Sequence, residues 1–347
     1  MAWGHDKGIA TKTLSNYPNA IAFSGHSHYS LTDERSIWQG AFTSIGQSSL
    51  YIDDDGIEDG KMNGFKVMFD CGNEIIPEEE VERIGKWVEK GGVFVAYPFT
   101  GCNTQLKADA WPMAKLTGAK IKAGEKIVRP GKVPKVAFPE GSKFFPSFAG
   151  QTMYGAKRRI YQLDFALEAV SDDAKPILFW DDGRIAATAR RVGKGLGVHL
   201  GSMFWRGSED VKGMWNPSDE VERTFLRDLL AAVGHSPALV ETDDRLVLAQ
   251  PYRSHDGLNL VAVLCNFNEE GDGFNTEAQR HRVTEVKLRT GSKPRRIVGY
   301  AGEGILFTAR SSGTRSRSRR VISRNTILAS GKTRHRILRK GGMFPIL

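Results

Sequence analysis

The chain has 347 residues, more than a single domain core usually accommodates. Its residues are 40% apolar and 26% charged, a composition that excludes a disordered chain. No run of about 18 apolar residues occurs, and residues 1–16 lack the regions of a secretory signal, so we expect no membrane partner and a cytoplasmic location by default. The three cysteines are far apart and odd in number, which excludes a disulfide framework and a zinc knuckle.

The first predicted element is a short apolar strand, Ala20–Phe23, that leads into a Gly-His-Ser-His motif at residues 25–28. Histidines two positions apart can turn their imidazoles to one side and ligate a metal or touch a phosphate. A divalent metal at His26 and His28 is therefore the one cofactor we consider. An acidic stretch at residues 53–60 predicts a linker or turn after a first domain, residues 1–52.

Residues 61–235 have the pattern of an α/β domain. The strand Phe65–Phe69 precedes Pro77, which opens a helix with three acids in its first turn and Gly91 at its end. The strand Val93–Tyr97 follows, and the whole is the length of a parallel βαβ unit. The helix has an apolar stripe at Val81, Ile84, Trp87 and Val88.

The second half of this domain predicts more strands and a closing helix. A tight Gly-Lys-Gly turn at residues 193–195 joins two of the strands. The helix can be capped by Ser218 or Asp219 and ends at Gly234. The strands are Ile177–Trp180, Ile185–Arg191 and Leu196–Leu200, and the apolar stripe of the helix is Val221, Phe225, Leu229 and Val233.

Strands alone are predicted in a small β domain at residues 236–309, namely Leu246–Ala249, Leu260–Phe267, Val283–Leu288 and Arg296–Tyr300. Residues 310–347 hold eleven cations and no acid, so the net charge of +9 resides there and disorder is predicted for this tail. Three readings stay open: an arm that binds nucleic acid, a solvated terminus, and, the one we favour, out-of-frame coding. We expect nucleic-acid binding from no other part of the chain.

Residues 20–52 resemble the C-terminal end of calcineurin-like metallophosphoesterases, whose last signature is Gly-His-x-His. Trp38, Gln39 and Gly40 and a Thr-Ser-Ile-Gly run accompany the motif. The family's other metal ligands lie upstream of this motif, and only 25 residues precede His26. The resemblance therefore implies a remnant at residues 1–52, or a phosphoesterase whose remaining ligands come from another chain.

Residues 61–308 resemble the class I glutamine amidotransferase-like domain, often called the trimerisation domain, and the following β domain of β-galactosidase-like glycoside hydrolases. The runs PEEEVERIGKWVEKGGVFVAY and VGKGLGVHLGSMFW carry the likeness. It implies a flavodoxin-like parallel sheet flanked by helices, a small antiparallel β domain, and a homo-oligomer formed through the α/β domain.

A true amidotransferase places a nucleophilic Cys on a sharp turn after a strand and activates it with a His. Here that turn falls at Pro98 or Phe99. Cys102 comes late and His199 lies inside its strand, so we favour ordinary core or rim residues over an active pair. The Glu78–Glu80 run is explained by its place in a helical first turn.

Aromatic rings can stack on the C–H face of a sugar, and the tryptophans considered for this are Trp87, Trp111, Trp180, Trp205 and Trp215. Trp87 and Trp180 fit a core better, and Trp205 and Trp215 are the preferred carbohydrate-binding candidates. With no room for a TIM barrel and its carboxylates, the sequence predicts a noncatalytic structural or assembly module of a carbohydrate-active hydrolase. The alternative is a calcineurin-like phosphoesterase fragment.

Overall fold

A computed structural model of the chain describes residues 21–24, 42, 45–70, 72–126, 135–154, 164–202, 220–235, 240–242, 247–253, 259–265, 284–289, 308–311, 318–323 and 327–328. The chain divides into two compact units, one made of residues 1–19, 43–48 and 238–347 and the other of residues 20–42 and 49–237. In the described ranges, each helix is too short or too polar to span a bilayer.

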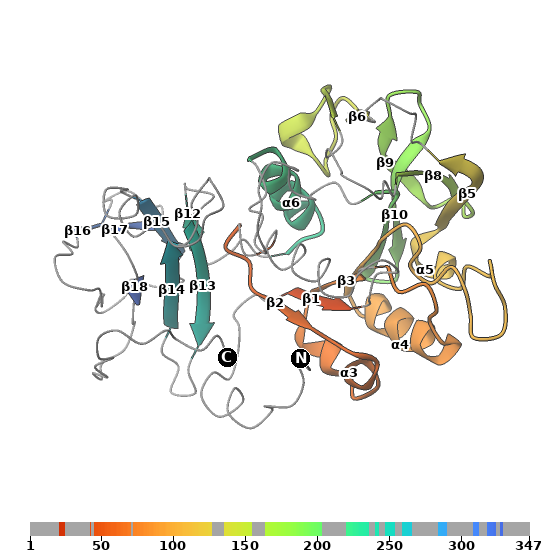
Figure 1. Cartoon of the computed structure of the whole chain (residues 1–347), viewed down its shortest axis with the longest axis horizontal. Helices are drawn as coiled ribbons and strands as arrows, with labels where there is room; N and C mark the ends of the chain where they lie inside the picture. The colour runs from red at the N-terminus through yellow and green to blue at the C-terminus, as the bar shows by residue number, and fades with distance from the viewer. Residues whose placement is uncertain are drawn as a thin grey trace, which may run out of the picture. The chain divides into compact units, whose positions relative to one another are not determined.

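An eleven-stranded sheet organises the larger unit (Figure 1), and its main path is β2-β1-β3-β4-β11-β10-β9-β6-β7. The first five strands on this path are parallel to one another. They are β2 (Ser49–Tyr51), β1 (Ile21–Ser24), β3 (Val67–Asp70), β4 (Val93–Ala96) and β11 (Gly195–Leu200).

The rest of the sheet is antiparallel, with β8 paired to β10 and β5 paired to β8. These strands are β10 (Ile185–Val192), β9 (Lys175–Trp180), β6 (Lys135–Ala137), β7 (Thr152–Tyr154), β5 (Ala119–Lys126) and β8 (Phe165–Ala169). The fold is therefore mixed α/β with few helices. The predicted parallel sheet is present only in part, because the β10–β11 hairpin reverses the chain direction, and a flavodoxin-like form is not confirmed.

The predicted βαβ unit is present as β3, α4 (Glu78–Glu89) and β4, with the two strands in parallel register. Pro77 is the residue before the first helical turn, one position earlier than predicted, and Gly91 follows the helix at a φ of 120°. That φ lies in the region that favours glycine, which is why the helix ends there.

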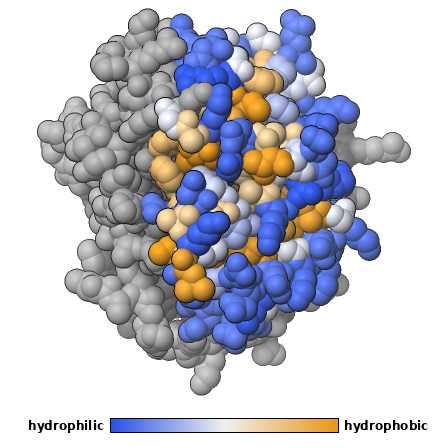
Figure 2. Space-filling view, turned by 90° about the vertical axis from the view of Figure 1, so that its right-hand side faces the viewer, coloured by the Kyte–Doolittle hydropathy of each residue, from blue (hydrophilic) through white to orange (hydrophobic). Residues whose placement is uncertain are grey.

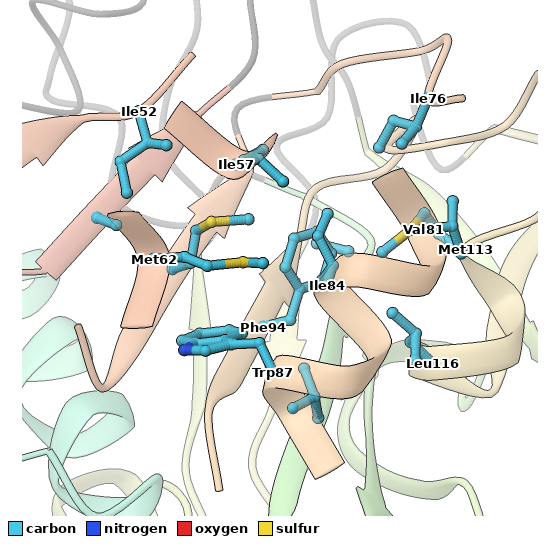
Figure 3. Close-up of a cluster of buried hydrophobic side chains, with 14 residues drawn as sticks. Ile52, Ile57, Met62, Ile76, Val81, Ile84, Trp87, Phe94, Met113 and Leu116 are labelled. Carbon is cyan, nitrogen blue, oxygen red and sulfur yellow. The ribbon is translucent and has the colours of Figure 1, made fainter. Parts of the chain in front are cut away.

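The apolar stripe of α4 packs into the main core cluster of the unit (Figure 3). Trp87 lies beside Phe94 of β4, while Val81 lies beside Met113, the residue before the short helix α5 (Ala114–Thr117). The other members include Met62, Ile84, Met113 and Leu116. Burying such side chains supplies most of the stability of a domain of this kind, and it fixes α4 against the sheet.

The β10–β11 hairpin and the closing helix follow the sequence pattern closely. Gly193 occupies the hairpin turn at a φ of 57°. Helix α6 (Glu220–Ala232) ends before Gly234, as predicted, and Phe225 of its stripe stacks on Phe145 at 4.4 Å between ring centroids. Phe145 precedes the short 3-10 helix η2 (Pro146–Phe148).

The acidic stretch for which a linker or turn was predicted contains helix α3 (Asp54–Glu58), followed by the 3-10 helix η1 (Lys61–Gly64). The Asp53 side chain accepts a hydrogen bond from Gly56 N–H at 2.9 Å and caps α3. Ile57 is buried in the same core cluster as Ile52. The side-chain N-cap and one buried apolar residue thus stabilise a short helix where the composition predicted a linker or turn.

The smaller unit contains two antiparallel sheets, β12-β15-β17-β16 and β13-β14-β18. Three of these strands lie wholly or partly in the tail for which disorder was predicted. In β17, Val321 and Ile322 are β-branched residues that favour strands, and the strand pairs with β15 along its length. The strands are β12 (Val240–Thr242), β13 (Val247–Arg253), β14 (Asn259–Cys265), β15 (Thr284–Arg289), β16 (Thr308–Ser311), β17 (Ser318–Ser323) and β18 (Ile327–Leu328).

Candidate functional site

The loops after β3 and β4 meet at the carboxyl edge of the parallel strands, where open α/β sheets bind ligands. Asn103 N–H donates to Glu74 O at 2.9 Å, and Gly101 N–H donates to Asn73 O at 2.7 Å. Ile75 and Asn103 form an isolated parallel bridge. The two loops are therefore joined by backbone hydrogen bonds, and this edge is the candidate site.

Asp70 at the end of β3 holds the two loops together. One of its carboxylate oxygens, Oδ1, accepts from Gly72 N–H at 2.9 Å, from Asn73 N–H at 2.8 Å and from the Thr100 hydroxyl at 2.7 Å. The Thr100 oxygen in turn accepts from Tyr97 N–H at 2.9 Å. A buried charge with this many donors is well satisfied, so the role of Asp70 is to brace the exit of β4.

Cys102 lies just beyond the place where an amidotransferase would carry its nucleophile. Its thiol is buried and donates to Glu74 O at 3.7 Å. Burial, followed by the nearby Glu74 carboxylate, raises the pKa of this thiol to about 11. Because the thiolate is the reactive form, Cys102 is a poor nucleophile at neutral pH.

His199 lies within β11, as predicted, and is only 1% exposed. Its Nδ1 is 3.0 Å from Ala119 O and its Nε2 is 3.2 Å from Pro98 O. Burial lowers the pKa of the imidazole, although the backbone carbonyls act in the opposite direction. Both ring nitrogens therefore face backbone carbonyls, with Thr117 Oγ1 also 3.4 Å from Nδ1, and neither is hydrogen-bonded to the Cys102 thiol.

Glu80 is a buried carboxyl with a raised pKa that the sequence pattern did not lead us to expect. Its side chain is only 5% exposed in the first turn of α4. Burial, then the charges of Asp54 and Asp70, raise the pKa of this carboxyl to about 7, against a smaller lowering by Arg83. The signal was present, since Glu80 precedes Ile84 by one helical turn and so shares its inward face.

The tryptophans separate into core and surface. Trp87 and Trp180 are 6% and 1% exposed, as expected for core residues, whereas Trp111 is partly exposed. The preferred sugar-binding residues Trp205 and Trp215 and the metal-ligand candidates His26 and His28 all lie outside the described residues, so both sites stay predictions. Within the described ranges, no three His, Cys, Asp or Glu side chains gather in a way that could hold a metal ion.

Comparison with known proteins gives no match to any family model and no match to a curated protein sequence. Solved structures do match. A GH42 beta-galactosidase from G. stearothermophilus has a TM-score of 0.58 at 13% identity over 91% of this chain and 40% of that chain. The cold-adapted beta-galactosidase of Rahnella sp. R3 has a TM-score of 0.57 at 15% identity over 89% and 40%.

An alpha-L-fucosidase from Paenibacillus thiaminolyticus is also similar, with a TM-score of 0.54 at 9% identity over 90% of this chain and 48% of that chain. The present chain thus spans less than half the length of these proteins. At such identities the likeness concerns the fold alone. It agrees with the β-galactosidase-like resemblance, whereas these structures lend no support to a metallophosphoesterase at residues 1–52.

Proposed function

We propose that the chain is a noncatalytic assembly module of the kind that accompanies the catalytic part of β-galactosidase-like hydrolases. The observation that carries the proposal is the fold likeness to a beta-galactosidase over 91% of this chain but only 40% of that one. A module that corresponds to two fifths of an enzyme is expected to contribute contacts to other domains or subunits.

The chemistry of the candidate site agrees with a noncatalytic role. The Cys102 thiol is held neutral by burial and by Glu74, and His199 faces backbone carbonyls on both sides. An acyl-transfer site needs a nucleophile within hydrogen-bond reach of its base. Cys102 and His199 instead stabilise the edge of the sheet.

Exposed aliphatic side chains at the same edge offer a surface for a partner subunit. Leu106 is 98% exposed and Ile75, on the adjoining loop, is 52% exposed. Thr104 braces the loop that carries Leu106, because its hydroxyl oxygen accepts from Leu106 N–H at 3.3 Å and from Lys107 N–H at 3.0 Å. An apolar side chain held out in this way is a suitable interface anchor.

The test is sedimentation of the full chain over a range of concentrations, together with an aryl β-galactoside assay. We expect an oligomer without turnover. The double variant Ile75→Ser/Leu106→Ser should shift the protein to monomer, while Val170→Ser, which changes another exposed aliphatic residue, should not. A wild-type protein that stays monomeric throughout, or one that hydrolyses the galactoside, would refute the proposal.

The second candidate function, a phosphoesterase completed by another chain, is favoured by one observation. The strand predicted before the Gly-His-Ser-His motif is present as β1, and its last residue, Ser24, lies in register with Asp70. Metal analysis and an aryl phosphate assay test this function. Bound divalent metal and turnover that are both lost in His26→Ala and His28→Ala would favour it over the assembly module.

A further inference from the structure

Two residues of the loop after β4 have backbone conformations that L-residues seldom adopt. Asp109 has a φ of 53° and Trp111 a φ of 51°, and these are the two non-glycine residues with positive φ in the described part of the chain. Trp111 also precedes Pro112, whose ring further restricts the backbone before it. Strain of this kind persists where surrounding contacts impose it, and it concentrates at ligand sites.

The contacts around Trp111 fix both its backbone and its ring. Trp111 N–H donates to Cys102 O at 3.0 Å, and its indole N–H donates to Asp109 Oδ1. The indole lies 6.2 Å from the His199 ring, between centroids. His199 is buried and Trp111 is partly exposed, so the Trp111 side chain lies between the buried imidazole and the surface of the loop.

Two polar side chains of the same loop, Asn103 and Asp109, keep hydrogen-bonding groups beyond the contacts that they make within the loop. Asn103 Oδ1 accepts from Asp109 N–H at 2.9 Å, which leaves the Asn103 amide nitrogen to donate elsewhere. Asp109 uses Oδ1 for the indole and retains Oδ2 as an acceptor. The exposed loop therefore combines a fixed aromatic face, one amide donor and one carboxylate acceptor.

We propose that Trp111, Asp109 and Asn103 form a carbohydrate-binding platform, with the apolar C–H face of one sugar ring on the indole and its hydroxyl groups on the carboxylate and the amide. A neutral ligand that has an apolar face, donors and acceptors matches all three groups at once. This role goes beyond the proposed assembly function and does not depend on it.

A small organic cation matches the platform less well. The Asn103 amide offers a cation only hydrogen-bond donors. A sugar is therefore favoured over an alkylammonium or guanidinium ligand.

The test is saturation-transfer NMR on the full chain with galactose, glucose and mannose in turn, and with tetramethylammonium as the cationic probe. We expect transfer to the C–H protons of one face of at least one sugar and none to the cation. Trp111→Ala should weaken sugar binding about tenfold or more, the loss of one aromatic contact. Asp109→Ala should weaken it by releasing the ring and removing the acceptor, whereas Asp109→Asn, which keeps an acceptor for the indole but loses the second carboxylate oxygen, should restore it only in part.

Gln105→Ala is the matched control, because it changes an exposed residue of the same loop that belongs neither to the platform nor to the surface of Ile75 and Leu106, and its affinity should equal that of the wild type. Should Trp111→Ala fail to fold, Trp111→Leu, which keeps an apolar side chain but removes the aromatic face, and the pattern of transfer in the wild-type complex give the same information. Transfer to no sugar, transfer to the cation only, or equal affinity in wild type and Trp111→Leu would overturn the platform. A monomeric protein that still binds sugar would refute only the assembly module.

Discussion

At the scale of single residues, the raised pKa of Glu80 gives the most specific prediction about stability. An unfolded glutamate has a pKa near 4.5 and the folded one about 7, so between these values the folded state binds more protons. The free energy of unfolding therefore falls as pH rises from 4.5 to 7. Glu80→Gln should remove this loss and raise stability above pH 7 by about 1–2 kcal/mol, after allowance for solvent screening.

The measurement is urea unfolding of wild type and variant at mildly acidic and mildly alkaline pH. Glu79→Gln is the matched control, since Glu79 is exposed in the same helical turn, and its effect should be small at both pH values. Equal gains for Glu80→Gln at acidic and alkaline pH would show that the carboxyl titrates normally in the folded protein.

Cys102 allows a second prediction at this scale. Because burial and Glu74 raise the pKa of its thiol to about 11, alkylation of the folded protein by iodoacetamide near pH 8 should be slow at this residue, at least about a hundredfold slower than for an unperturbed thiol. Peptide mass spectrometry after timed quenching separates Cys102 from Cys71 and Cys265. Rapid alkylation at Cys102 would indicate a thiolate and reopen the nucleophile hypothesis.

At the scale of elements, the hairpin strand β11 depends on its glycines. A Cβ at Gly197 would lie 2.3 Å from the Leu116 backbone oxygen, and α5, which contains Leu116, cannot move without disturbing the core. Gly197→Ala should therefore cost about 3 kcal/mol or more. Gly64→Ala is the control, because nothing lies within 4 Å of its added Cβ; equal melting temperatures for the two variants would contradict this packing.

Elements set by local pattern were predictable from the sequence, and those set by distant partners were not. Helix α4 has its stripe, acidic first turn and terminal glycine within its own residues, and the β10–β11 turn has its glycines. By contrast, the pairing of β1 with β3 joins residues far apart in the chain, which periodicity does not reveal. The Asp109–Trp111 conformation likewise depends on contacts with Cys102 and Asn103.

At the scale of the whole molecule, the distribution of charge separates residues 310–347 from the rest of the chain, whereas strand pairing joins them to it. The eleven cations after Ala309 leave the rest of the chain close to neutral, and composition alone made this tail look separable from the fold. In the structure, β17 pairs with β15 and β18 pairs with β14. The tail therefore supplies strands to both sheets of the smaller unit, and composition was a poor guide because backbone pairing does not require apolar side chains on every position.

Deletion of residues 310–347 tests whether the tail is a structural part of the sheets of the smaller unit. Without β17, β15 loses its hydrogen-bonded partner on one side and keeps only β12 on the other, so its amides should exchange with solvent much faster. The amides of β3, β4 and β11 should keep their protection, because the strands that pair with them all belong to the larger unit. Hydrogen-exchange mass spectrometry reports both regions in one experiment. Unchanged exchange in β15 would mean that the tail adds nothing to the sheet, and faster exchange in β4 would mean that the larger unit also relies on it.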